Sequence, residues 1–147
     1  MVRAAVTLAG FTLFAAGIAP HAIADPGAGR QYVRTQSGAV RCIVISAELN
    51  DGDSMITCEH GPGFAQAPLG PYGEHFDEAV IRASGAFSWN NANLGGGGTP
   101  QNDLVLNYGQ TYHVLGWTIV PSSDGTRFTN DGTGHGMFVS IENVKSF

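Results

Sequence analysis

The strongest constraint on the fold of this chain is its pair of cysteines, Cys42 and Cys58, which lie on either side of a turn sequence. Each cysteine lies in a β-rich run, and Asn50-Asp51-Gly52-Asp53 between them is typical of a tight turn. When the segment is folded antiparallel about residue 50, the two cysteines face each other. The same register creates an apolar pair and an oppositely charged pair: Val44 with Ile56, and Arg41 with Glu59. The pattern therefore predicts a hairpin closed by a disulfide.

Residues 1–24 are predicted to be a cleavable secretory signal peptide. Arg3 is their only charge, residues 4–18 form an apolar run too short to span a bilayer, and Ala22-Ile23-Ala24 fits the cleavage pattern. We therefore expect a secreted or envelope-associated protein that begins near Asp25 and has no transmembrane segment after cleavage. In an oxidising compartment a lone cysteine pair usually forms a disulfide, and the absence of a C-x-x-C motif disfavours a redox or metal site.

The rest of the chain repeats the pattern of short β-rich runs separated by turn dipeptides. We expect further strands over residues 80–83, 86–89, 111–120, 127–129 and 137–144. The last three of these are expected to form an antiparallel meander, and residues 74–79 at most one helical turn. With roughly seven to nine short strands, residues 25–147 are predicted to form a single all-β domain, either a small antiparallel β-sandwich or a partly closed barrel.

Residues 90–103 depart from this pattern because they contain four consecutive glycines, Gly95 to Gly98. Ordering such a run costs much conformational entropy, so we expect a mobile surface loop. A plain connection is favoured, and a lid formed by residues 94–103 is the alternative. The run is not a phosphate loop, because no lysine follows it and no strand-to-helix context surrounds it.

Charge and ligand spacing exclude several classes of partner. The formal net charge is −5, and removal of Arg3 would make it more negative, which argues against nucleic acid as a partner. Asp51-Gly52-Asp53 lacks the further ligands of a calcium loop, with Met55 where a ligand is needed. The histidines show no zinc-site spacing: His60 and His75 flank a loop, and His113 lies in a predicted strand. We therefore expect no metal and no cofactor.

The segment from Asn130 to Gly136 is the most unusual candidate site, because it places His135 between two glycines and Asp131 nearby. Arg127 precedes the segment and Ser140 follows it, so a Ser–His–Asp hydrolase is one interpretation. No nucleophile-elbow sequence is present, and Ser140 lies inside a predicted strand. A tight turn in which the histidine makes only local hydrogen bonds is favoured over a catalytic site.

Aromatic residues provide a third candidate site. Trp89, Tyr108, Tyr112 and Trp117 are the right residue types for a platform that contacts sugar rings or lipid chains. Small β domains use the same residues in their cores, so core packing is the favoured interpretation. Trp89 and Trp117 are nevertheless candidate binding residues, together with Arg127 and His135.

Several segments resemble a group of small exported proteins of mycobacteria and their actinobacterial relatives. They are Ser37 to Cys42, Cys58-Glu59, Gly109 to Tyr112, Gly116 to Ile119 and Gly125 to Met137. The alanine-rich signal peptide and the Asp-Pro start of the mature chain fit the same group. The resemblance covers most of residues 31–147 and implies an extracytoplasmic location. The resemblance assigns no function to individual residues.

Two classes of function follow from these observations. The first is a non-enzymatic binding or interaction module, whose partner would be an envelope component or a small apolar ligand. This class is favoured because the charged residues do not cluster into an acid–base pair. A β-barrel carrier of a lipid-like ligand is a variant of it. The second class is a small envelope hydrolase that uses His135 with Asp131.

Overall fold

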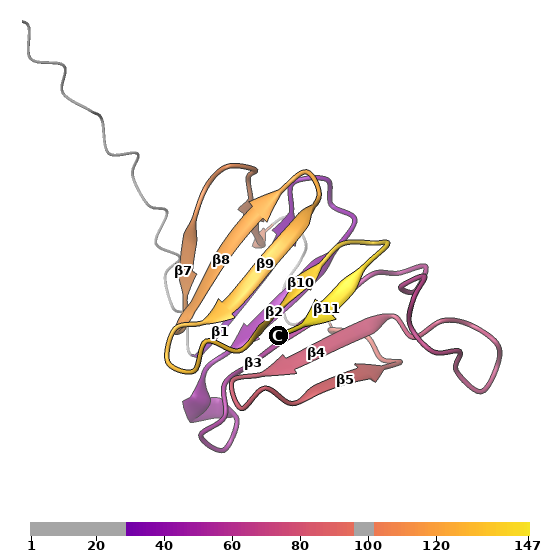
Figure 1. Cartoon of the computed structure of the whole chain (residues 1–147), viewed down its shortest axis with the longest axis horizontal. Helices are drawn as coiled ribbons and strands as arrows, with labels where there is room; N and C mark the ends of the chain where they lie inside the picture. Colours follow the sequence, from indigo (N-terminus) through magenta and orange to yellow (C-terminus); the bar gives the residue numbers. More distant parts are fainter. Residues whose placement is uncertain (1–28, 96–101) are drawn as a thin grey trace, which may run out of the picture.

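The computed structural model of the chain describes residues 29–95 and 102–147, which form two β-sheets packed face to face (Figure 1). The first sheet contains β1 (Arg30–Thr35), β2 (Arg41–Ile45), β3 (Met55–Glu59), β4 (Glu78–Arg82), β5 (Phe87–Asn90) and β6 (Leu104–Leu106). The second contains β7 (Tyr112–Val114), β8 (Trp117–Ser122), β9 (Gly125–Asn130), β10 (Gly136–Val139) and β11 (Val144–Ser146). A short 3-10 helix, η2 (Ala47–Leu49), lies between β2 and β3.

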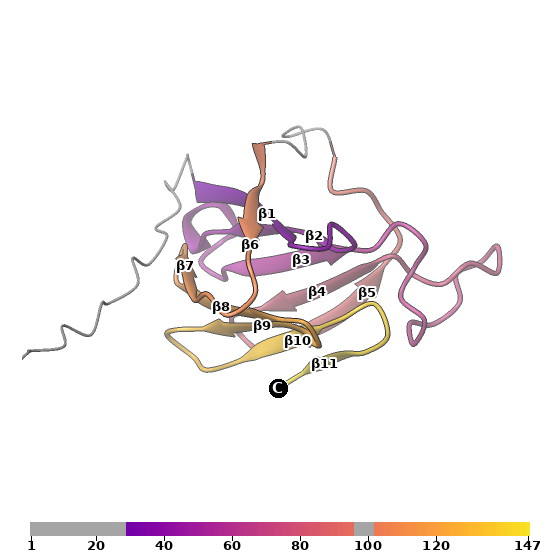
Figure 2. The same ribbon diagram turned by 90° about the horizontal axis from the view of Figure 1, so that it is seen from above.

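The predicted sandwich is confirmed, and the barrel alternative is wrong for the described residues. The strand order is β5-β4-β3-β2-β1-β6 in one sheet and β11-β10-β9-β8-β7 in the other, with no strand shared between them. Figure 2 shows the two layers edge-on. Every pair of neighbouring strands is antiparallel except β1 with β6, which is parallel. The predicted meander is present as β8, β9 and β10.

The predicted hairpin between β2 and β3 is confirmed in its register. Cys42 lies opposite Cys58, Val44 opposite Ile56, and Arg41 opposite Glu59. The two cysteines form a disulfide and are both buried. Closing a loop of this length stabilises the native state by about 3 kcal/mol in the chain-entropy model.

The core lies between the two sheets and follows the alternation of side chains along each strand. In β9, Thr126, Phe128 and Asn130 are buried, whereas Arg127 between them is exposed. The largest fully buried side chains are Trp117, Phe64, Phe128, Ile56, Ile81 and Leu106. Phe64 comes from the long connection between β3 and β4, so this loop also contributes to the core.

Two predicted strands are wrong. Residues 111–120 form a hairpin, because Leu115 and Gly116 both have positive φ, of 49° and 82°, and make a two-residue turn between β7 and β8. Residues 137–144 break after Val139, where the Ser140 hydroxyl binds the backbone of Asn143 and closes a turn. Residues 74–79 lead into β4 without a helical turn. Strands β1 and β6 were not predicted.

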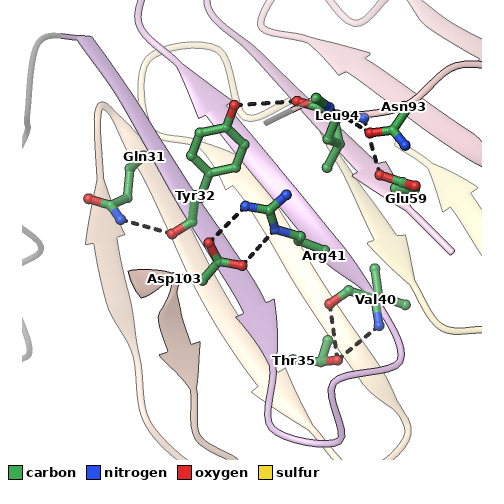
Figure 3. A network of polar contacts seen from close by, with 10 residues as sticks. Gln31, Tyr32, Thr35, Val40, Arg41, Glu59, Asn93, Leu94 and Asp103 are labelled. Carbon is green, nitrogen blue, oxygen red and sulfur yellow. Dashed lines mark hydrogen bonds and ion pairs between the residues drawn. The ribbon is translucent and has the colours of Figure 1, made fainter. Parts of the chain in front are cut away.

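The connection from β5 to β6 is anchored at both of its described ends on the outer face of the first sheet (Figure 3). After β5, the backbone N–H of Leu94 donates to Glu59, and its carbonyl accepts a hydrogen bond from Tyr32. Before β6, Asp103 accepts two hydrogen bonds from Arg41, at 2.7 and 3.0 Å. The guanidinium of Arg41 also lies 4.5 Å from the centre of the Tyr32 ring.

Two predictions fall outside the described residues. The signal peptide, residues 1–24, is one of them. The other is most of the glycine-rich connection that was predicted to be a mobile loop, with a lid as the alternative, from residue 96 to residue 101. In the described ranges no helix has the length and apolar character needed to cross a bilayer.

Candidate functional site

A pocket of about 230 Å³ opens at one end of the sandwich, where the β1–β2, β8–β9 and β10–β11 turns come together. Half of the residues that line it are serine or threonine: Thr35, Ser37, Ser122, Ser123, Thr126 and Ser140. Tyr108, from the connection between β6 and β7, also lines the pocket, and none of the described lining residues is charged. Because three separate turns and a loop build the pocket, it depends on the packing of both sheets.

Side-chain hydroxyls make the walls of the pocket rigid. In the β1–β2 turn, the Thr35 hydroxyl donates to the carbonyl of Val40 and accepts its N–H, both at 3.2 Å. In the β8–β9 turn, Ser122 donates to the carbonyl of Gly125 at 2.9 Å and accepts the N–H of Asp124 at 3.3 Å. Since these bonds fix each turn internally, the pocket is formed without a ligand.

Tyr108 is held at the pocket by its backbone. Its N–H donates to the side chain of Gln36 at 2.9 Å, which ties this loop to the β1–β2 turn. The preceding N–H, of Asn107, donates to the hydroxyl of buried Tyr112 at 2.9 Å. The Tyr108 side chain itself is 39% exposed. A fixed backbone with an accessible ring suits contact with a ligand.

Thr126 differs from the other hydroxyl residues of the pocket. It is 1% exposed, and its Oγ1 has no hydrogen-bond partner among the described residues. A buried hydroxyl without a partner is costly, so natural structures usually provide one. Thr126 is therefore a polar group that lines the pocket and has no partner in the described part of the chain.

The segment from Asn130 to Gly136 lies at the opposite end of the sandwich and joins the two sheets. The side-chain oxygen of Asn130 accepts the N–H groups of Gly132 and Thr133, at 3.1 and 3.0 Å. The Thr133 hydroxyl donates to the carbonyl of Ala83, in the β4–β5 turn, at 2.7 Å. The ring of His135 packs on the same turn, since a Cβ on Gly85 would lie 3.1 Å from three of its atoms.

Asp131 is linked to His113, and not to His135, through the hydroxyl group of Thr118. Its carboxylate accepts a hydrogen bond from Thr118 at 2.5 Å, and the same hydroxyl lies 3.1 Å from Nδ1 of His113. His113 and Asp131 are both exposed. The structure thus brings Asp131 together with Thr118 and His113, and it places His135 against Gly85.

The remaining candidate binding residues do not share a site. Trp117 is fully buried, and its indole donates to Ser54, so it is a core residue. Trp89 packs against Phe64 and Phe87 at the edge of the core. The exposed guanidinium of Arg127 stacks on the ring of Phe147, 3.6 Å from its centre.

The candidate metal ligands have structural partners instead. His60 and His75 bond backbone carbonyls through Nδ1. Asp53 accepts hydrogen bonds from the N–H and the hydroxyl of Ser84, which links the β2–β3 and β4–β5 turns. Across the described ranges, no group of three or more His, Cys, Asp and Glu side chains is arranged to hold a metal ion.

The sequence pattern indicated two of the three turns that form the pocket without identifying the pocket, and the third, between β10 and β11, lies in residues 137–144, which were predicted to be one strand. Ser37-Gly38 and Pro121 to Gly125 are among the turn sequences that separate the β-rich runs, yet nothing in the pattern indicated that they meet. Tyr108 was assigned to an aromatic platform whose other members lie elsewhere. Comparison of the chain with family models, with curated proteins and with solved structures found no match.

Proposed function

We propose that this chain is a non-enzymatic binding domain whose ligand occupies the pocket at the β1–β2, β8–β9 and β10–β11 turns. The observation that carries the proposal is the pocket itself, which is formed by rigid turns and is lined by Thr126, whose buried hydroxyl has no partner among the described residues. Concave sites with a few fixed polar groups are where small ligands bind. The disulfide suits a protein that works outside the cytoplasm, which supports the proposed export to the cell envelope or beyond.

The geometry supports a binding function more than either alternative. The hydrolase alternative needs His135 beside Asp131, but Asp131 bonds Thr118 and the His135 ring packs on Gly85. The linked groups Asp131, Thr118 and His113 lie on the second sheet, away from the pocket lining. A carrier of lipid chains needs a larger cavity than one of about 230 Å³, half of whose lining residues are serine or threonine.

The test is to block the pocket without removing any of its hydroxyl groups. Ala39 lines the pocket and is exposed, so Ala39→Trp should fill it and leave the fold intact. Ala86→Trp is the matched control, because Ala86 is also exposed and lies in the β4–β5 turn at the other end. Wild-type protein purified from its native host would be analysed by native mass spectrometry for a retained small molecule.

We expect the wild type and Ala86→Trp to retain the same small molecule and Ala39→Trp to lose it. Thermal melting of all three proteins provides the control for folding. Retention of the molecule by folded Ala39→Trp would show that the pocket is not the binding site. A wild-type protein that retains no molecule and binds none from a small-molecule panel would refute the proposed function.

A further inference from the structure

We infer that the ligand of this pocket is an uncharged molecule rich in hydroxyl groups, of about the size of one sugar ring. The ligand donates hydrogen bonds to groups that line the pocket. This inference rests on the proposed function and specifies the chemistry of its ligand. It follows from the charge of the lining, the hydrogen-bonding state of its hydroxyls, the buried Thr126 and the position of Tyr108.

The lining argues against an anionic ligand. None of the described residues that form it is charged. The binding of a carboxylate or phosphate group needs several N–H donors or a cationic side chain, because desolvating the anion is costly. The pocket thus suits a ligand without net charge.

The hydroxyls of the walls offer acceptors rather than donors. Ser140 donates to the carbonyl of Asn143 at 3.2 Å and accepts its N–H at 3.0 Å. Ser122 donates and accepts in the same way within its own turn. A hydroxyl oxygen has two lone pairs and one hydrogen, so each of these residues retains one lone pair after its turn has formed. A ligand that donates hydrogen bonds, as a sugar hydroxyl does, matches these free acceptors.

Thr126 provides a hydrogen-bonding group that the protein leaves unsatisfied. Its Oγ1 is buried, has no partner in the described part of the chain, and belongs to a residue that lines the pocket. Because Oγ1 has almost no accessible surface, a ligand hydroxyl would reach it only if the lining side chains shift, and it would then satisfy Oγ1 in either role, since a hydroxyl can both donate and accept. A purely apolar ligand would leave it unpaired, which disfavours lipid chains.

Tyr108 adds an aromatic surface beside these polar groups. Its side chain is 39% exposed, although hydrogen bonds to neighbouring backbone groups fix the loop that carries it. An aromatic face packs against the C–H face of a sugar ring while the ring hydroxyls bond to polar groups around it. The volume of about 230 Å³ is below the range typical of drug-sized ligands and suits a single ring.

The experiment is an NMR titration of the full chain with probes of five kinds. Methyl glycosides of glucose, mannose, galactose and arabinose represent free sugars, and octyl glucoside below its micelle concentration represents a glycolipid headgroup. Choline represents a cationic ligand, inorganic phosphate a small anion, and decanoate a fatty acid with an apolar chain. We expect at least one glycoside to shift the amide signals of the lining residues, whereas choline, phosphate and decanoate leave them unchanged.

Two variants test the residues that carry the inference. Thr126→Val preserves the shape of the side chain and removes its hydroxyl, and Thr129→Val is the control on the same strand, outside the lining. We expect Thr126→Val and Tyr108→Ala each to weaken glycoside binding about tenfold, while Thr129→Val changes it less than twofold. Unchanged glycoside affinity in folded Thr126→Val would overturn the role of the buried hydroxyl.

The outcomes separate this inference from the proposed function. Binding of choline, phosphate or decanoate at the lining, with no glycoside bound, would overturn the inference and leave the pocket as a ligand site. If none of the probes and no retained molecule binds at the pocket, both proposals fail. Stronger binding of octyl glucoside than of methyl glucoside would support the inference and indicate that the sugar is the headgroup of a lipid.

Discussion

Breaking the ion pair between Arg41 and Asp103 should destabilise the protein by different amounts depending on which partner is removed. The side chain of Asp103 is 1% exposed, whereas that of Arg41 is 19% exposed. The hydrogen bond that Arg41 donates to Asp103 raises the pKa of Arg41 against the opposing effect of burial, so the guanidinium is charged throughout the pH range in which the protein is handled. Because Asp103 is more buried than Arg41, the variant that leaves Asp103 without its partner should lose more folding free energy.

Arg41→Met leaves the carboxylate of Asp103 buried without its cationic partner. Leaving a buried charge uncompensated costs about 3–5 kcal/mol of folding free energy. Asp103→Leu leaves the guanidinium, which is closer to solvent and still stacks on Tyr32, so we expect a loss of about 1–2 kcal/mol. The double variant removes both charges and should be more stable than Arg41→Met alone.

The measurement is equilibrium unfolding in urea at neutral pH, followed by the fluorescence of buried Trp117 and fitted by linear extrapolation. Equal slopes of the unfolding free energy against urea concentration across the series would establish that the variants share one unfolding transition. A loss below about 1 kcal/mol for Arg41→Met, or a larger loss for Asp103→Leu, would refute the argument from unequal burial. A double variant that loses the sum of the two single losses would show that the pair is not coupled.

Three further predictions address the disulfide, a crowded glycine and a buried carboxyl. Replacing Cys42 and Cys58 together with Ser should lower the free energy of unfolding by about 2–4 kcal/mol in urea denaturation; a smaller loss would contradict the chain-entropy argument. Gly136→Ala should destabilise strongly, because its Cβ would lie 2.0 Å from a carbonyl oxygen of β9, whereas Gly132→Ala should melt near the wild-type temperature. Burial, followed by repulsion from two neighbouring carboxylates, raises the pKa of Glu78 above its ordinary value of 4.5, so ionising this group weakens the native state as pH rises through and above that value. Glu78→Gln should therefore raise the melting temperature at pH 7, and this gain should vanish below about pH 4, where a gain that persists would refute the assignment.

Local pairing rules were sufficient to predict the β2–β3 hairpin. Its register depends on contacts within one short segment, and three facing pairs agree on it. Leu115 was not recognised as a turn residue, because a branched side chain rarely adopts positive φ, and only the fold around it makes this conformation acceptable. The parallel pairing of β1 with β6 depends on residues far apart in sequence, which periodicity does not reveal.

The candidate site was less predictable than the fold, for a related reason. The pocket combines turns from both sheets, so its existence follows from tertiary packing and not from any motif. The lack of a partner for Thr126 depends on its neighbours in space, and a threonine within a predicted strand gives no sign of it. Asn130 was interpreted as a turn residue, and the structure adds that its amide links the second sheet to Ser54 of the first.

The position of β6 has a consequence for the order in which the chain folds. The second sheet is a succession of hairpins between strands adjacent in sequence, and β1 to β5 form the same kind of succession. Each of these pairings closes a comparatively short loop, so both successions assemble at a low entropic cost. β6 pairs with β1 only after the chain has passed across the first sheet, which makes its addition the slowest pairing to nucleate. Until then β1 presents an unpaired edge, the part of the folding chain most open to pairing with another copy.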